Sequence, residues 1–315
     1  MRLFDVYIAV DWSARSVPSP ARPTRDALWV AETLAPEIAA SDAEVLSGET
    51  YWRTRQVCLA YIRTRLRQHI AHNRRVLLGF DFCYGYPAGY AAALGLTGTE
   101  PPWRRIWNEL DLLIGDNSTN GNNRFAVAAT LNERCAGQTP GPLWGCADGV
   151  RLSALPARNP GFPYRTRQGH LLEQFRQTER CGSGGQPAWK LYGSGSVGGQ
   201  TLLGIPAVCG LRDDPEFAAI SRVWPFETGF TPTPIPNHGP AILHAEIYPA
   251  LVSHRLDPTL PIRDQAQVRA TARWLGELDT ENRLSQLFMA PDHLPTAAID
   301  TCVEEEGWML GAGMS

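Results

Sequence analysis

Apolar and polar positions follow strand-like and helix-like periods in the first part of the chain. Continuous apolar runs at residues 6–11 and 76–81 are typical of central strands that are covered on both faces. A second strand is expected at residues 27–33 and a weaker third strand near residues 43–46. Between residues 50 and 71, apolar side chains recur at helical spacing, which predicts an amphipathic helix. The N-terminal part therefore reads as three strands, a helix and a further strand.

The middle of the chain lacks this regularity. Residues 95–240 are rich in Gly, Pro and Asn and contain only modest helical segments. Order returns at residues 241–248, where polar and apolar side chains alternate as in a strand with one polar face. Helices are expected after it, from residue 264, at residues 281–289 and at residues 296–306.

The order of these elements predicts an α/β fold with a mixed sheet flanked by helices. Three strands, a helix and a fourth strand is the order of an RNase H-like sheet, which ribonuclease H, RuvC and actin-like proteins share. We expect residues 1–94 and 241–315 to form this core. Residues 95–240 are expected to form a large irregular insertion, or lid, packed on the core.

Composition limits the classes of partner. The 315 residues are 43% apolar and 19% charged, and the net charge is −3, so any contact with nucleic acid requires a local basic patch. No apolar segment approaches the ~20 residues that span a bilayer, and the first residues lack the apolar stretch of a secretory signal. Seven Cys without a Cys-x-x-Cys pair favour reduced thiols, and hence a cytoplasmic protein without a membrane association.

Two predicted strands end on an acidic residue. Asp11 is the last residue of the first run, and Asp81 is the last residue of the run at 76–81. Packing in the core does not explain why a buried strand would end on Asp. In sheets that contain parallel strands, the chemistry usually lies beyond the carboxyl ends of the strands. The alternative is that each Asp opens a turn by accepting hydrogen bonds from nearby backbone N–H groups.

Two further acids are candidates for the same site. Glu246 lies within a largely apolar strand, where an ionised carboxylate needs solvent, a partner or a metal. Asp264 opens a predicted helix, although Asp followed three residues later by Gln267 also resembles a capping box. Four carboxylates that repel one another favour a hard dication, Mg²⁺ or Mn²⁺, and two such ions can promote in-line attack on a phosphodiester.

A glycine-rich segment is a candidate for binding phosphate. Its backbone N–H groups and a nearby lysine could hold a phosphate of a nucleic acid or nucleotide; the residues are Lys190, Gly193, Ser194, Gly195 and Ser196. The alternative is a flexible turn. A Rossmann site is poorly supported, because no complete strand–helix–strand unit surrounds the segment.

Several motifs together resemble the domain-of-unknown-function family 429, which is described as predicted nucleases with an RNase H-like fold. They are Val-Asp-Trp-Ser-Ala at 10–14, Gly-Phe-Asp-Phe-Cys-Tyr-Gly-Tyr-Pro at 79–87, the segment 189–200, Val-Trp-Pro-Phe-Glu-Thr-Gly at 223–229, His-Ala-Glu-Ile-Tyr-Pro at 244–249 and Glu-Gly-Trp-Met-Leu-Gly at 306–311. The resemblance spans nearly the whole chain and implies that Asp11, Asp81, Glu246 and Asp264 are catalytic metal ligands. It also implies an acid on the final helix, for which Asp300, Glu304, Glu305 and Glu306 are candidates.

These observations favour metal-dependent phosphodiester hydrolysis, with nucleic acid as the expected substrate. The main alternative is an actin-like, ATP-using phosphotransferase or ATPase in which the glycine-rich segment contacts phosphates. A third alternative is a non-catalytic protein that binds a nucleotide or a partner.

Overall fold

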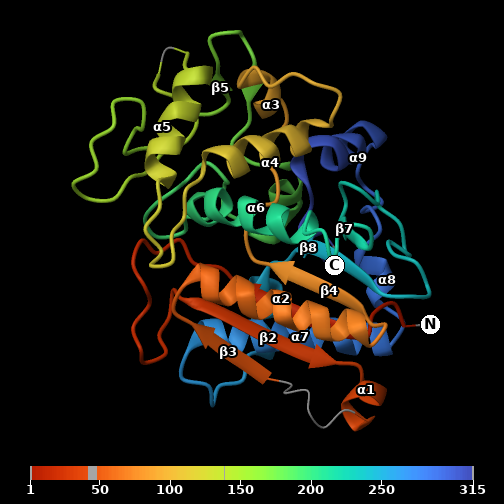
Figure 1. The fold of residues 1–315 in the computed structure, drawn as a ribbon. Coiled ribbons are helices and arrows are strands. Elements are labelled where there is room, and N and C mark those ends of the chain that lie inside the picture. The colour runs from red at the N-terminus through yellow and green to blue at the C-terminus, as the bar shows by residue number, and fades with distance from the viewer. Residues whose placement is uncertain (1, 42–47, 138, 314–315) are drawn as a thin grey trace.

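The computed structural model describes residues 2–41, 48–137 and 139–313, and a six-stranded mixed sheet lies at its centre (Figure 1). The strand order is β3-β2-β1-β4-β8-β7, which is consistent with RNase H-like topology. The strands are β1 (Val6–Asp11), β2 (Leu28–Leu34), β3 (Gly48–Trp52), β4 (Arg75–Phe80), β7 (Ser221–Val223) and β8 (Ala241–Glu246). The protein is therefore an α/β protein, as the sequence pattern predicts.

The direction of the strands changes across the sheet. β1, β2 and β3 form an antiparallel meander, whereas β1, β4, β8 and β7 run parallel to one another. The carboxyl ends of β1, β4 and β8 consequently meet at one edge of the sheet. Loops that follow these three strands can combine their side chains there.

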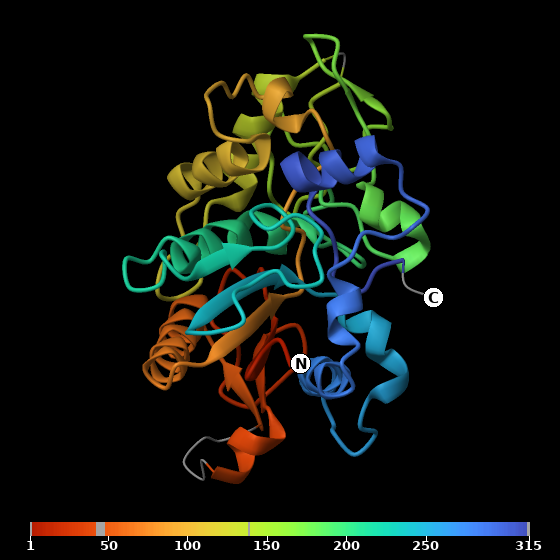
Figure 2. The ribbon, with the colours of Figure 1, turned by 90° about the vertical axis from the view of Figure 1, so that its right-hand side faces the viewer.

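Alternate residues of each strand face opposite layers of helices. Ile8 and Val10 pack into the cluster that contains α2 (Arg55–Ala71), whereas Ala9 packs into the cluster that contains α7 (Arg263–Thr280). Figure 2 shows α2 and α7 on opposite sides of the sheet. Acidic side chains can therefore contact one another at the strand ends only if they lie on the same face of the sheet.

Much of the middle segment forms the upper half of the molecule in Figure 1. The short helix α3 (Tyr90–Ala93) precedes this segment, which contains α4 (Pro102–Leu113), α5 (Arg124–Cys135), β5 (Tyr164–Arg165), β6 (Leu171–Leu172) and α6 (Gly198–Arg212). The segment is tied closely to the sheet, because β7 pairs with β8 and side chains of α6 share the core cluster of α2. The C-terminal part contains α8 (Leu284–Leu287) and α9 (Thr296–Thr301), and α1 (Pro36–Ser41) follows β2.

Several predicted boundaries need correction. The helix expected from residue 50 begins at Arg55, because residues 48–52 pair with β2 as strand β3. The weak strand expected near residues 43–46 lies outside the described residues. The predicted helices at 281–289 and 296–306 shorten to α8 and to α9 followed by a further helical turn. Within the described ranges, no helix has the length and apolar character needed to cross a membrane.

Candidate metal centre

Asp11 and Asp81 lie side by side at the carboxyl edge of the sheet. Asp11 is the last residue of β1, and Asp81 directly follows the parallel neighbour β4. The N–H of Asp81 donates to Val10 O at 3.2 Å, and the N–H of Trp12 donates to Asp81 Oδ1 at 2.7 Å. Asp11 is 9% exposed, whereas Asp81 keeps partial contact with solvent. The two carboxylates therefore share one partly open site.

Asp264 reaches this site from helix α7, which packs on the face of the sheet toward which Asp11 and Asp81 point. α7 packs across β1 and β2, and Asp264 lies in its first turn. Its Oδ2 accepts a hydrogen bond of 2.6 Å from the N–H of Asp26. The residue before the helix is Ile262 and no side chain caps this end, so the capping-box interpretation of Asp264 is wrong. Asp264 is positioned by the loop before β2 and points toward the strand ends.

Asp26 is a fourth acid at this edge, and the sequence analysis missed it. It lies two residues before β2, which runs antiparallel to β1 and pairs Trp29 with Asp11. Its backbone adopts a left-handed conformation with φ 54°, which Asp tolerates better than most residues. The predicted antiparallel pairing of the first two strands could have identified Asp26. In such a pair, the residues just before the second strand lie next to the end of the first strand.

Positive charge reaches the outer part of the cluster, where Asp26 forms an ion pair with Arg25 at 3.8 Å and Arg263 and Arg25 oppose the rise in the pKa of Asp264. Burial and then repulsion by Asp81, Asp264 and Asp26 raise the pKa of Asp11 well above its usual value. Burial, helped by Asp264 and opposed by the Trp12 N–H, raises the pKa of Asp81 to about 7. Burial also raises the pKa of Asp264. Within the described part of the chain, neither Asp11, Asp81 nor Asp264 forms a salt bridge, so a cation from solution is the natural partner of this group.

The structure does not bring Glu246 into this group. Glu246 pairs with Phe80 in the sheet, and both therefore face the α6 side, whereas the next residue, Asp81, faces α7. Arg176 binds the Glu246 carboxylate through two hydrogen bonds of 2.6 and 2.8 Å, and the Tyr84 N–H donates to it at 2.9 Å. Glu246 is thus held by a guanidinium on the opposite face of the sheet from Asp11.

Distances between ligand atoms support this division. Among the described residues, the set of three potential ligand atoms within 4.8 Å of one another is Cys83, Glu179 and Glu246. Arg176 also binds Glu179, at 2.5 and 3.0 Å, so its positive charge already serves both glutamates. The carboxylate oxygens of Asp11, Asp81 and Asp264 do not all lie within this spacing.

The acids of the C-terminal helical region have other positions. Asp300 and Glu304 are exposed. Glu305 Oε2 accepts the N–H of Gly89, and the Glu306 carboxylate accepts the N–H groups of Ala88 and Gln177. Glu305 and Glu306 therefore fix the loop after β4, and none of these acids is in contact with the aspartate cluster among the interactions of the described residues.

The glycine-rich segment lies close to the cluster through the start of α6. Gln200 Nε2 donates to Trp12 O at 2.7 Å, one residue after Asp11. Gly193, Ser194 and Gly195 are exposed and Ser196 is half-buried. The Lys190 ammonium donates to Ser194 O and lies 5.4 Å from the centre of the Trp144 ring, so it folds back onto its own loop.

A wide groove continues from the cluster along the surface. It has a volume of about 1310 Å³ and runs between the loop before β2, the strand β3 and the start of α7. Asp26 and Asp264 line one part of it, and three exposed arginines line it as well, namely Arg22, Arg25 and Arg263. Negative ligands for a metal thus adjoin positive groups that suit a phosphate-bearing substrate.

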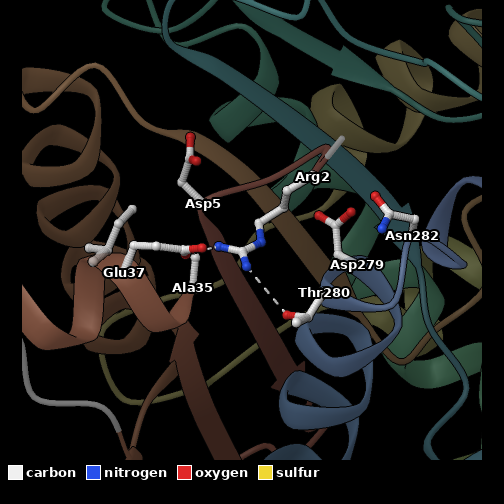
Figure 3. A pocket seen from close by; sticks show the side chains of 8 residues that line it. Arg2, Asp5, Ala35, Glu37, Asp279, Thr280 and Asn282 are labelled. Carbon is white, nitrogen blue, oxygen red and sulfur yellow. Dashed lines mark hydrogen bonds and ion pairs between the residues drawn. The ribbon is translucent and has the colours of Figure 1, made fainter.

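A second pocket, of about 380 Å³, lies at the opposite end of β1 (Figure 3). Arg2 spans it and contacts both Glu37 and Thr280. Asp279 accepts hydrogen bonds from the N–H groups of Leu3 and Phe4 and from the Tyr7 hydroxyl. Because its polar groups bind one another, this pocket fastens the N-terminus to α7 and is not the candidate site.

Comparisons of the chain with protein-family models, with curated proteins and with solved structures gave no significant match. The resemblance to family 429 therefore stays a prediction. A function has to be argued from the aspartate cluster and the groove beside it.

Proposed function

We propose that this protein is a metal-dependent phosphodiesterase that acts on nucleic acid, with an RNase H-like fold. The observation that carries the proposal is the group formed by Asp11, Asp81 and Asp264, three carboxylates with raised pKa values, none of which forms a salt bridge within the described residues. They lie at the carboxyl edge of parallel strands, where such folds usually hold their active sites. The motifs shared with family 429 support the same function.

The donor set fits hard divalent ions. Asp11, Asp81 and Asp264 offer only carboxylate oxygens, which Mg²⁺ and Mn²⁺ prefer, and positive charge would lower their raised pKa values. Bound there, such ions supply activated water and stabilise the leaving oxygen of a phosphodiester. Glu246, which Arg176 already neutralises, is excluded from the proposed ligand set.

The chain itself contributes orientation and substrate binding. The Trp12 N–H fixes one oxygen of Asp81, and the Asp26 N–H fixes one oxygen of Asp264, so each keeps its other oxygen for an ion. Arg22, Arg25 and Arg263 line the adjoining groove, where they would neutralise phosphates on either side of the scissile one. These arginines support the proposal, because they provide the local basic patch that a protein of negative net charge needs to bind a polyanion.

The test is a calorimetric titration of the metal-stripped protein with Mn²⁺, followed by cleavage assays with labelled DNA and RNA oligonucleotides. Saturable binding that is lost in Asp11→Asn and in Asp81→Asn, together with Mn²⁺-dependent cleavage, is the expected result. Asp148→Asn, at an exposed position, is the control for the loss of one charge. Unchanged binding in both cluster variants would refute the proposed centre.

One observation favours a second candidate, an ATP-using phosphotransferase or ATPase. The hydrogen bond between Gln200 and Trp12 O joins the start of α6, and with it the glycine-rich segment, to the strand end that carries Asp11. Phosphates of a nucleotide would then lie near a metal held by Asp11. Metal-dependent ATP turnover without cleavage of any oligonucleotide would favour this function over the nuclease.

A further inference from the structure

Arg124 is a buried arginine whose charge is not balanced by a carboxylate. It is the first residue of α5 and is 6% exposed. Its Nη1 donates to Ser16 Oγ and to Asn122 Oδ1, both at 2.8 Å, and its guanidinium lies 4.3 Å from the centre of the Phe125 ring. All of these partners are neutral, and Arg124 forms no salt bridge within the described residues.

Two of its nitrogen atoms have no hydrogen-bond partner among the described residues. Nε is buried and has no hydrogen-bond partner. Nη2 donates to no described residue and is not among the buried unpartnered atoms, so it is open to solvent. A buried donor without an acceptor is costly, and a buried charge without a partner is more so.

The neighbouring Arg55 shows the contrast. Arg55 is fully buried and binds both carboxylate oxygens of Asp116, at 2.5 and 2.6 Å, as well as Ser13 O and Arg15 O. Its charge is therefore balanced. Burial, followed by repulsion from Arg55, lowers the pKa of Arg124 to about 10. The anion that opposes this shift is Asp116, whose carboxylate Arg55 already binds.

The start of α6 faces the same place. A Cβ atom placed on Gly199 would lie 3.5 Å from Arg124 Nε and 3.3 Å from Ala14 Cβ. The N–H groups of Gly199 and Gln200 have no acceptor in the described part of the chain, and the 15-residue helix directs the positive end of its dipole here. An arginine nitrogen without a partner and a helix N-terminus thus converge independently on one point.

We propose that Arg124 and the first turn of α6 form a binding site for a phosphate group. Ser16 borders the site, and the segment 12–16 links it to Asp11. The site goes beyond the proposed function, because it binds an anion without a metal. In a nucleic-acid substrate it would hold a phosphate other than the one that is cleaved.

The experiment is calorimetric titration of the full-length, metal-stripped protein with inorganic phosphate in the presence of EDTA. Arg124→Gln removes the free donors, and Ser16→Asp supplies an internal carboxylate to Arg124 at an exposed position where folding is safe. Each change should weaken phosphate binding by at least about tenfold, because a charge-assisted hydrogen bond is lost or taken. Arg167→Gln, at an exposed arginine elsewhere, should leave binding unchanged.

Titration with ATP and with a short oligonucleotide separates the sources of the phosphate. Saturable binding of phosphate, of ATP or of the oligonucleotide supports the site if Ser16→Asp weakens or removes that binding. The ligand that binds most tightly identifies the source of the phosphate group. No saturable binding to any of the three ligands, or equal binding in Ser16→Asp and the unaltered protein, would overturn it. Asp81→Asn should bind phosphate normally, so failure of the metal centre and failure of this site give different results.

Discussion

Asp81→Asn should stabilise the metal-free protein at alkaline pH. The change removes a charge that is costly to bury and that Asp264 repels, and the amide oxygen of Asn can still accept the hydrogen bond that the Trp12 N–H donates to Asp81 Oδ1. The side chain also keeps its size, so packing at the end of β4 is preserved. A residue proposed to hold a metal would thus lower the stability of the protein whenever the metal is absent.

The magnitude follows from the pKa of Asp81, which lies at about 7 in the folded protein against an ordinary value of 3.8. Because the folded state holds the proton more tightly, stability is highest below the lower value and falls as the pH rises through the higher one. Three pKa units correspond to about 4 kcal/mol. Partial contact with solvent screens the charge, so we expect about 2 kcal/mol of the free energy of unfolding at about pH 8.

Urea denaturation in EDTA at about pH 4 and about pH 8 measures this effect. The Asn variant should exceed the unaltered protein in free energy of unfolding at the higher pH and match it at the lower one. Asp148→Asn is the control at an exposed site. Added Mn²⁺ should reverse the order, because only the unaltered protein gains from binding. An Asn variant that is equally or less stable at about pH 8 would refute the argument from the raised pKa of Asp81.

Three further outcomes are expected. Glu246→Gln should leave Mn²⁺ affinity unchanged in calorimetry, whereas Asp264→Asn should weaken it at least about tenfold, since only Asp264 belongs to the cluster; equal losses would contradict this assignment. Arg176→Met should lower the free energy of unfolding by about 3–5 kcal/mol in urea denaturation, because two buried glutamates lose their counter-charge; a small change would show that this ion pair is dispensable. Joint replacement of Arg25 and Arg263 by Gln should reduce the salt dependence of oligonucleotide binding, measured by fluorescence anisotropy without metal, by about 1.5 in the logarithmic slope; an unchanged slope would place the nucleic acid outside the groove.

The two strand-end aspartates were predictable because an apolar run that stops on Asp shows both the strand and its end. The sequence pattern groups Glu246 with Asp11 and Asp81, but Glu246 lies on the other face of the sheet, because a shift of one position along a strand moves a side chain to the opposite face. Its register against Phe80 depends on strand pairing, which a single sequence does not reveal. Arg176 and Asp26 lie in irregular segments without periodicity, so neither the neutralisation of Glu246 nor the fourth acid of the cluster could be foreseen.

The ion pair between Arg176 and Glu246 also determines how far the chain can be shortened. Arg176 belongs to the middle segment and Glu246 to a central strand, and both are almost completely buried. A version of the protein that lacks residues 95–240 would keep Glu246 in an apolar layer without its cation, and the strand that carries it would be the first to separate. Trimming to a minimal sheet therefore requires an uncharged residue at position 246, and Arg176 and Glu246 have to be kept or replaced together.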